Sequence, residues 1–142
     1  MSQAHFDLDL GDAANAGVYR VDAASLDTMA ALARDAGLRV LRVDLDGCGD
    51  KRTLLARLAA QLDFPAGMGG NWDALSDALR DLSWLPASGY ALLLEAADAL
   101  PAGSPGDFAT LLDVLDEASG AWAREQVPFV AFIALEDPHQ AA

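Results

Sequence analysis

The chain has a single cysteine, Cys48, and only two histidines, His5 and His139. One thiol cannot form an internal disulfide, and the lack of disulfides is typical of a reducing compartment. A catalytic thiol would need a neighbouring histidine, but both histidines lie close to the ends of the chain. No cluster of residues has the spacing of metal ligands either. We therefore expect no metal and no cofactor.

Export and membrane signals are missing as well. Residues 1–9 lack the basic start and the apolar core of a signal peptide. No apolar run is long enough to cross a bilayer. These absences predict a cytoplasmic protein with no membrane partner.

Basic residues are scarce. Lys and Arg total 9 against 22 Asp and Glu, which gives a formal net charge of −13, and Lys51 is the only lysine. Such a surface repels nucleic acid, because binding to phosphates needs cations. It attracts a basic partner and speeds the encounter with it. The alternative is that the acidic surface only keeps the protein soluble.

Short apolar runs alternate with helical patterns along the chain. The patterns predict strands at 18–21, 38–45, 90–95 and 128–135, and helices at 26–36, 50–62, 71–84 and 107–122. Asp50 is placed to cap the second helix, and residues 101–106 read as a Pro/Gly/Ser loop. Strands separated by helices, two of them continuously apolar, predict a small α/β domain with a mostly parallel sheet.

The length of 142 residues fits one domain. We expect a single domain over 17–137, of which 17–37 is a strand-helix extension that leaves room for an additional edge strand. Residues 1–16 are polar and are expected to be loosely ordered, and 138–142 form a tail.

The most informative segment runs from 64 to 84. It combines a glycine-rich loop, a capping asparagine (Asn71) and an amphipathic helix. At about 100° of rotation per residue, one face of this helix is apolar and should meet the core: Trp72, Leu75, Leu79 and Leu82. The adjacent face carries Asp73, Ser76, Asp77, Arg80 and Trp84.

Two interpretations of this face remain open. Asp73 and Asp77 are i,i+4 neighbours, an arrangement that disfavours an isolated helix by a few tenths of a kcal/mol, roughly. They either form a solvated acidic face or mimic successive phosphates and dock into a cationic cleft. The glycines of 67–70 likewise either let the backbone approach a partner or serve only a tight connection.

The amino-acid sequence of this segment resembles that of the barstar family of intracellular ribonuclease inhibitors. The resemblance rests on Pro65, the run Gly69-x-Asn71-x-Asp73-Ala74-Leu75-x-Asp77-x-Leu79, the strand Leu92-Leu93-Leu94-Glu95 and the helix Leu112-x-Val114-x-x-Glu117-Ala118. It covers roughly residues 38–136. It implies a three-stranded parallel sheet packed by helices, to which residues 17–37 would add a possible fourth strand at the edge.

The resemblance also implies a function. In the family, the helix and the loop before it plug the active site of a small basic ribonuclease, and acidic residues matching Asp73, Asp77 and Glu117 contact its cationic groups. The expected protein is an inhibitor of the immunity or antitoxin type, not an enzyme, and a monomer when free. The partner-binding residues expected are Gly67, Met68, Gly69, Gly70, Asn71, Asp73, Ser76, Asp77, Arg80, Trp84 and Glu117.

Departures from the family pattern support a second interpretation. The loop has Gly67 and Met68, and the helix has Ser76, where a family member carries aromatic residues. Aromatic anchors are common hot spots of binding. The alternative is therefore an interaction module of the same fold with a partner that is not a nuclease.

A less favoured interpretation is a phosphatase with an aspartate nucleophile. Val43-Asp44-Leu45-Asp46-Gly47 ends a predicted strand and resembles the first motif of haloacid-dehalogenase-type phosphatases. That chemistry needs Mg²⁺ with further acidic ligands and a cation for the phosphate. Cys48-Gly49 departs from the motif, and no convincing pair of metal ligands follows. A strand-end turn explains the segment better.

Overall fold

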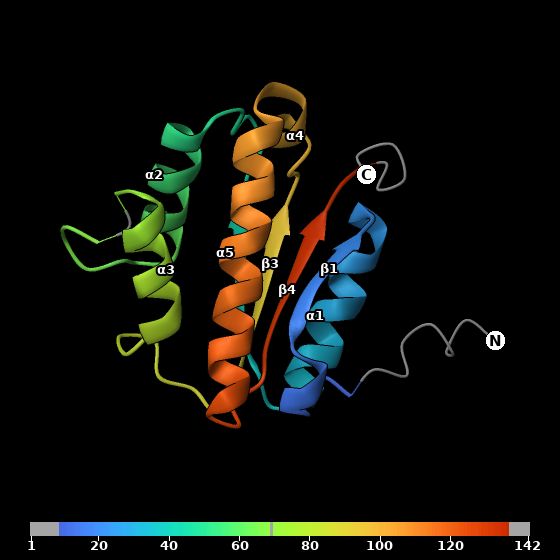
Figure 1. The fold of residues 1–142 in the computed structure, drawn as a ribbon. Coiled ribbons are helices and arrows are strands. Elements are labelled where there is room, and N and C mark those ends of the chain that lie inside the picture. Colours follow the sequence, from blue (N-terminus) through green and yellow to red (C-terminus); the bar gives the residue numbers. More distant parts are fainter. Residues whose placement is uncertain (1–8, 69, 137–142) are drawn as a thin grey trace.

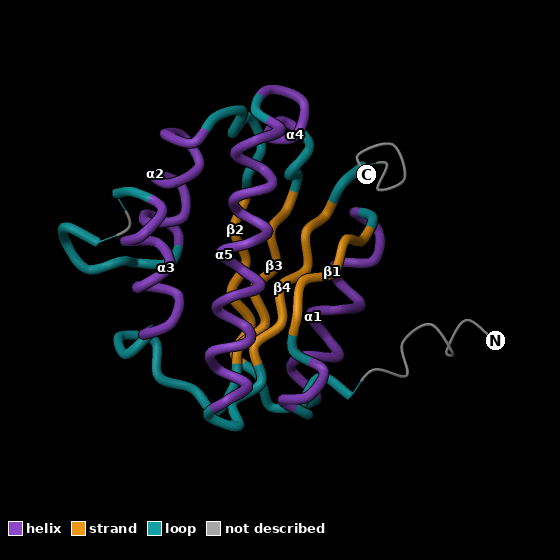
Figure 2. Tube along the Cα trace, in the orientation of Figure 1, coloured by secondary structure: helices purple, strands orange, loops and turns teal. Residues whose placement is uncertain are grey.

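The computed structural model describes residues 9–68 and 70–136. Its centre is a four-stranded, all-parallel sheet in the order β1-β4-β3-β2 (Figures 1 and 2). The strands are β1 (Gly17–Val21), β2 (Arg39–Asp44), β3 (Tyr90–Glu95) and β4 (Phe129–Ala134). The predicted α/β fold with a parallel sheet is confirmed, and the strand from the N-terminal extension is the fourth, at one edge.

The two central strands are the most apolar ones. Every residue of β4 is buried, and every residue of β3 except Glu95. Parallel strands covered on both faces have this continuous apolar composition, whereas the edge strands β1 and β2 carry exposed arginines. In register, Gly17 lies opposite Val130 and Arg39 opposite Tyr90.

Helices cover the two faces of the sheet unequally. The helices are α1 (Leu26–Asp35), α2 (Lys51–Gln61), α3 (Trp72–Asp81), α4 (Ala99–Gly103) and α5 (Pro105–Arg124), with 3-10 turns at Ala13–Asn15 and Ala23–Ser25. Figure 2 shows α5 in front of the strands and α1 behind them. The larger core lies on the α2, α3 and α5 side and includes Leu92, Leu94 and Ile133. The smaller core lies under α1 and includes Leu93, Val130 and Phe132.

Two helix boundaries differ from the prediction. The expected loop at 101–106 is wrong, because Ala99–Gly103 is helical and α5 already begins at Pro105. Pro101 stands in the first turn of α4, where a backbone N–H has no intrahelical partner, and Pro105 occupies the first turn of α5 for the same reason. The third helix ends at Asp81 and not near Trp84, because Leu82 takes a left-handed conformation with φ 49°.

The N-terminal segment is described from residue 9 onward. Leu10 is buried in the core under α1, and the Tyr19 hydroxyl donates a hydrogen bond to the backbone oxygen of Asn15 at 2.7 Å. Leu10 and Asn15 thereby connect residues 9–16 to the core and to β1, and the loose order expected of residues 1–16 stays a prediction. Residues 1–8 and the tail 138–142 lie outside the described part of the chain.

Candidate functional site

Two helices that lie side by side on one face of the sheet carry the candidate site. The first is α3, which buries Leu75, Ala78 and Leu79 against the core. Its cap is the Asn71 side chain, which accepts the N–H of Ala74 at 2.7 Å. The second is α5, whose Trp122 indole N–H donates to the backbone oxygen of Leu79 at 2.8 Å. This contact fixes the spacing of α3 and α5.

The surfaces of α3 and α5 enclose an open hollow of about 630 Å³. From α3 come three of the predicted residues, Asp73, Ser76 and Arg80; α5 contributes Glu117, which was expected from the family resemblance. Asp73, Arg80 and Glu117 are exposed. The hollow thus brings residues of α3 together with residues of α5 that lie 36 positions or more away in the sequence. Its full lining is Asp73, Ser76, Arg80, Asp116, Glu117, Gly120 and Arg124.

Sequence reasoning missed the residues that α5 adds beside Glu117. Asp116, Gly120 and Arg124 share the α5 surface with it, at spacings of three or four residues that place them on one stripe. This periodicity was available in the sequence. What was not available is that α5 turns this stripe toward α3.

Asp77, the second acid of the pair on α3, is exposed, with 70% of its side chain accessible. It forms an ion pair with Arg80, whose Nη2 lies 2.8 Å from its Oδ1, while the Arg80 Nε lies 3.3 Å from the backbone oxygen of Ser76. The face is therefore not purely acidic. A cation that approaches Asp77 meets a carboxylate already shared with the protein's own guanidinium.

The loop before α3 has one position that requires glycine. Gly67 has φ +85°, a conformation that other residues rarely adopt. Gly70 has no such φ, and a Cβ there would meet nothing within 4 Å. Met68 and Gly70 border a small, mainly apolar hollow of about 330 Å³ against the α2 residues Lys51, Arg52 and Leu55. The tight connection explains Gly67 but not Gly70, and Gly69 lies outside the described residues.

Trp84 does not belong to the exposed face of α3, which corrects its predicted place there. It follows the end of the helix, and its indole N–H donates to the backbone oxygen of Leu62 at 3.0 Å. Its ring packs edge-on against Phe64, with 5.6 Å between ring centroids. Trp84 is half-buried and connects the segment after α3 to the end of α2. Trp72, expected to face the core, is likewise partly buried against it.

The barstar family model, described as Barstar (barnase inhibitor), matches residues 38–134. The chain belongs to the barstar family. No curated protein matches the chain.

The barstar match places the whole candidate site inside the family region. It runs from the start of β2 to the end of β4 and includes α2, α3 and α5, so both helices that line the hollow are covered. β1 and α1 lie before it.

Among the helices of residues 9–68 and 70–136, none combines the length and the apolar character that a bilayer span needs.

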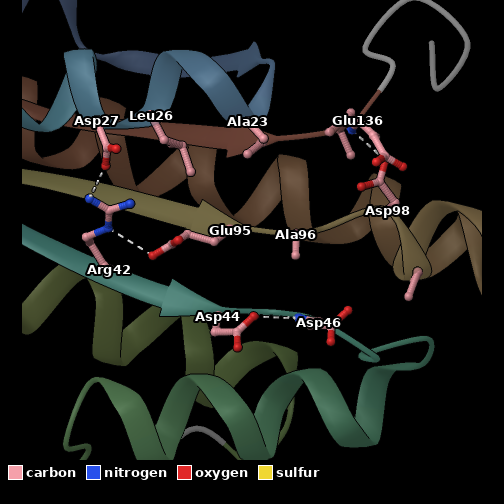
Figure 3. Close-up of a pocket in the computed structure, with 13 residues that line it drawn as sticks. Ala23, Leu26, Asp27, Arg42, Asp44, Asp46, Glu95, Ala96, Asp98 and Glu136 are labelled. Carbon is pink, nitrogen blue, oxygen red and sulfur yellow. Dashed lines mark hydrogen bonds and ion pairs between the residues drawn. The ribbon is translucent and has the colours of Figure 1, made fainter.

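A second hollow, of about 620 Å³, lies at the carboxyl ends of the strands and is lined in part by Asp44 and Asp46, from the motif on which the phosphatase interpretation rested (Figure 3). Asp44 there accepts the backbone N–H of Asp46 at 2.9 Å, which is the geometry of a strand-end turn. Arg42 bonds Glu95 at 2.9 Å and Asp27 at 3.0 Å. These hydrogen bonds, first that to Glu95, raise the pKa of Arg42.

No metal centre emerges in this second hollow. In the described part of the chain, no three His, Cys, Asp or Glu side chains are grouped so that they could hold a metal ion. Arg42, the one basic residue among those that line the hollow, is already paired with two carboxylates. The arrangement offers no free cation for a phosphate, and the strand-end turn accounts for the Asp44-Asp46 motif.

Proposed function

We propose that this chain is a stoichiometric protein inhibitor of a small basic ribonuclease and has no catalytic activity of its own. The observation that carries the proposal is that Asp73 and Glu117 line one hollow between α3 and α5, with Asp77 one turn along α3 from Asp73, within the region matched by the barstar family. The loop-helix segment around residues 66–84 would enter the cationic active site and exclude RNA. Met68 and Gly70 would contact the rim of the enzyme beside Asn71, and Gly67 would hold the turn.

Electrostatics supports this function at two ranges. The net charge of −13 attracts a basic protein over distances of about a Debye length, near 8–10 Å at ordinary ionic strength. At contact, exposed carboxylates form charge-assisted hydrogen bonds with Arg or Lys, which are about twice as strong as neutral ones. We further propose that the inhibitor meets its target in the cytoplasm as a free monomer.

The function is tested by titrating ribonuclease activity. Barnase and a panel of other small basic microbial ribonucleases are mixed with increasing amounts of the protein. We expect at least one enzyme to lose its activity at a molar ratio of one, since one inhibitor covers one active site. An unchanged activity of every enzyme at a tenfold excess of the protein would refute the proposal.

Substitution of Asp77 tests the site. We expect Asp77→Ala to weaken binding of the inhibited ribonuclease by more than about 2 kcal/mol, because it leaves a buried cation of the enzyme unpaired. Charge pairs of this kind are known from the complex of barnase with barstar, and the expected loss of binding free energy is of the size found for such pairs. Asp73→Ala and Glu117→Ala should cost less.

The control is Asp35→Ala, which removes an exposed aspartate at the end of α1 on the other face of the sheet. Binding is measured by calorimetry at fixed ionic strength. A loss below 0.5 kcal/mol, roughly, for Asp77→Ala, or an equal loss for Asp35→Ala, rules out this part of the site.

A second candidate function is that of an interaction module with a partner other than a nuclease. Ser76 favours it, because a half-buried serine stands at the centre of the α3 face where an aromatic anchor would contribute most to binding. A pull-down from lysate and culture supernatant, with wild type and Asp73→Ala/Asp77→Ala as paired baits, separates the two. A small basic nuclease retained by wild type alone supports inhibition, whereas an unrelated protein retained in the same way supports the module.

A further inference from the structure

The hollow between α3 and α5 contains charges of both signs. Two of the nine basic residues of the chain, Arg80 and Arg124, line it together with Asp73, Asp116 and Glu117. In a chain with more than twice as many acids as bases, this is a local exception. A surface that binds only cations is not expected to carry a guanidinium among its lining residues, because that guanidinium would repel the cations of the partner.

Arg124 reaches back over the hollow from the last turn of α5. A Cβ on Gly120 would lie 3.8 Å from its Nη1, so the guanidinium lies above the one position of this stripe that has no side chain. Arg80 approaches from α3 and pairs with Asp77 at 2.8 Å. Its side chain is 47% exposed. Both cations are therefore accessible to a bound protein.

Binding of a nuclease would separate Arg80 from Asp77, its ion-pair partner in the free protein. If a cation of the nuclease pairs with Asp77, the exposed ion pair between Asp77 and Arg80 is lost at small cost, since exposed ion pairs contribute little to stability. Arg80 and Arg124 would then be desolvated in the interface, with Asp116 as the one lining carboxylate that is not paired with a cation of the nuclease. A guanidinium left in that state is strongly unfavourable unless an acidic group pairs with it.

We propose that the partner presents an acidic side chain to Arg80 and Arg124, next to the cations that face Asp73, Asp77 and Glu117. This inference rests on the proposed function and specifies the nuclease further: the border of its basic active site carries at least one carboxylate. A free polyanion is a poor match for the hollow, because three carboxylates line it. Arg80 and Arg124 then act as specificity determinants that exclude uniformly basic enzymes.

The sign of a substitution effect tests the proposal. Any loss of an arginine makes the chain more acidic and should speed its association with a basic enzyme. Arg34→Gln, an exposed arginine of α1 on the opposite face of the sheet, measures this general effect. We expect Arg80→Gln and Arg124→Gln each to have a Kd for the ribonuclease at least fivefold above that of Arg34→Gln. The probe is the ribonuclease of the panel that wild type inhibits, beginning with barnase.

The opposite result is equally informative. If Arg80 only competes for Asp77, Arg80→Gln lowers the Kd, and a Kd equal to or below that of Arg34→Gln for both variants overturns the inference while leaving inhibition intact. If wild type inhibits no enzyme of the panel, the proposed function and this inference fail together.

A cross-linking experiment tests the predicted carboxylate directly. Lys51 is the only native lysine, so an Arg124→Lys variant adds one amine to the hollow. A carbodiimide activates a carboxylate, the lysine amine displaces the activating group to form an amide, and a urea leaves. We expect mass spectrometry to find residue 124 joined to an Asp or Glu of the nuclease. Intermolecular links from Lys51 alone, or none from residue 124 in a complex that still forms, would contradict the proposal.

Discussion

Cys48 shows how a single side chain can be isolated from chemistry by its surroundings. It has no exposed surface and belongs to the larger core, with its Sγ 4.0 Å from the backbone oxygen of Thr53. Burial is the main cause that raises the pKa of its thiol, and the carboxylates of Asp44 and Asp50 act in the same direction. A thiol reacts as its thiolate, so a raised pKa leaves less of the reactive form at any given pH.

We therefore expect Cys48 to be unreactive in the folded protein. A chromogenic disulfide reagent at pH 8 should modify it at least a hundredfold more slowly than in urea-unfolded protein, where the thiol has its ordinary pKa. The native rate should go on rising with pH beyond the pH at which the rate of the unfolded chain levels off, because a thiol with a raised pKa becomes fully ionised only at higher pH. Equal rates in the two states would show that the thiol is accessible.

At the scale of one element, α3 is defined by its two ends. Asn71 has an extended backbone and caps the first turn, while Leu82 reverses the chain in a left-handed conformation with its side chain fully buried. Leucine rarely adopts φ 49°, so the burial of its side chain must compensate the strain. These two residues set which part of the chain presents Asp73 and Asp77.

The cap can be tested without altering the acidic side chains. Asn71→Ala removes the bond to the Ala74 N–H and should lower the free energy of unfolding by about 1 kcal/mol. Asn71→Asp keeps an acceptor at the same place and is the matched control, with a loss below half of that. Urea denaturation at pH 7 measures both. Equal stability of wild type and Asn71→Ala would mean that tertiary packing alone fixes the start of α3.

The sequence allowed prediction of most elements but not of how their surfaces meet. The strand at 90–95 has the predicted bounds, because a continuous apolar run between Gly89 and Ala96 leaves no other choice. The helix Ala99–Gly103 was missed because Pro101 argues against a helix unless it falls in the first turn. The place of Trp84 was wrong because nothing local marks Leu82, a leucine, as the end of α3.

The candidate site shows the same limit. Asp73, Ser76 and Asp77 could be placed on one surface from periodicity alone, and Glu117 came from the family resemblance. Arg124 could not be found, because its position over the hollow depends on the packing of Trp122 against Leu79, a contact across 43 residues. Contacts of this range follow from the whole fold and not from a local pattern.

On the scale of the whole molecule, the segment before the family region completes the sheet. β1 pairs with β4, and α1 covers the face that α5 leaves open (Figure 1). Without residues 1–37, Leu93, Val130 and Phe132 would lose their cover on that face. Each such large apolar side chain contributes about 1.5–3 kcal/mol when fully buried. Their combined loss approaches the total stability of a typical domain, about 5–15 kcal/mol.

A chain that begins at Leu38, the start of the family match, should therefore not form a stable monomer. We expect it to aggregate, or to lose most of its unfolding transition in calorimetry and elute as large species in size-exclusion chromatography, because the exposed apolar face and the unpaired edge of β4 both promote association. A chain that begins at Asp9 keeps β1, α1 and Leu10 and is the control with which the melting of the chain from Leu38 is compared. If the chain from Leu38 melts cooperatively as a monomer at the same temperature, residues 9–37 serve a purpose other than stability, and the fold is carried by the family region alone.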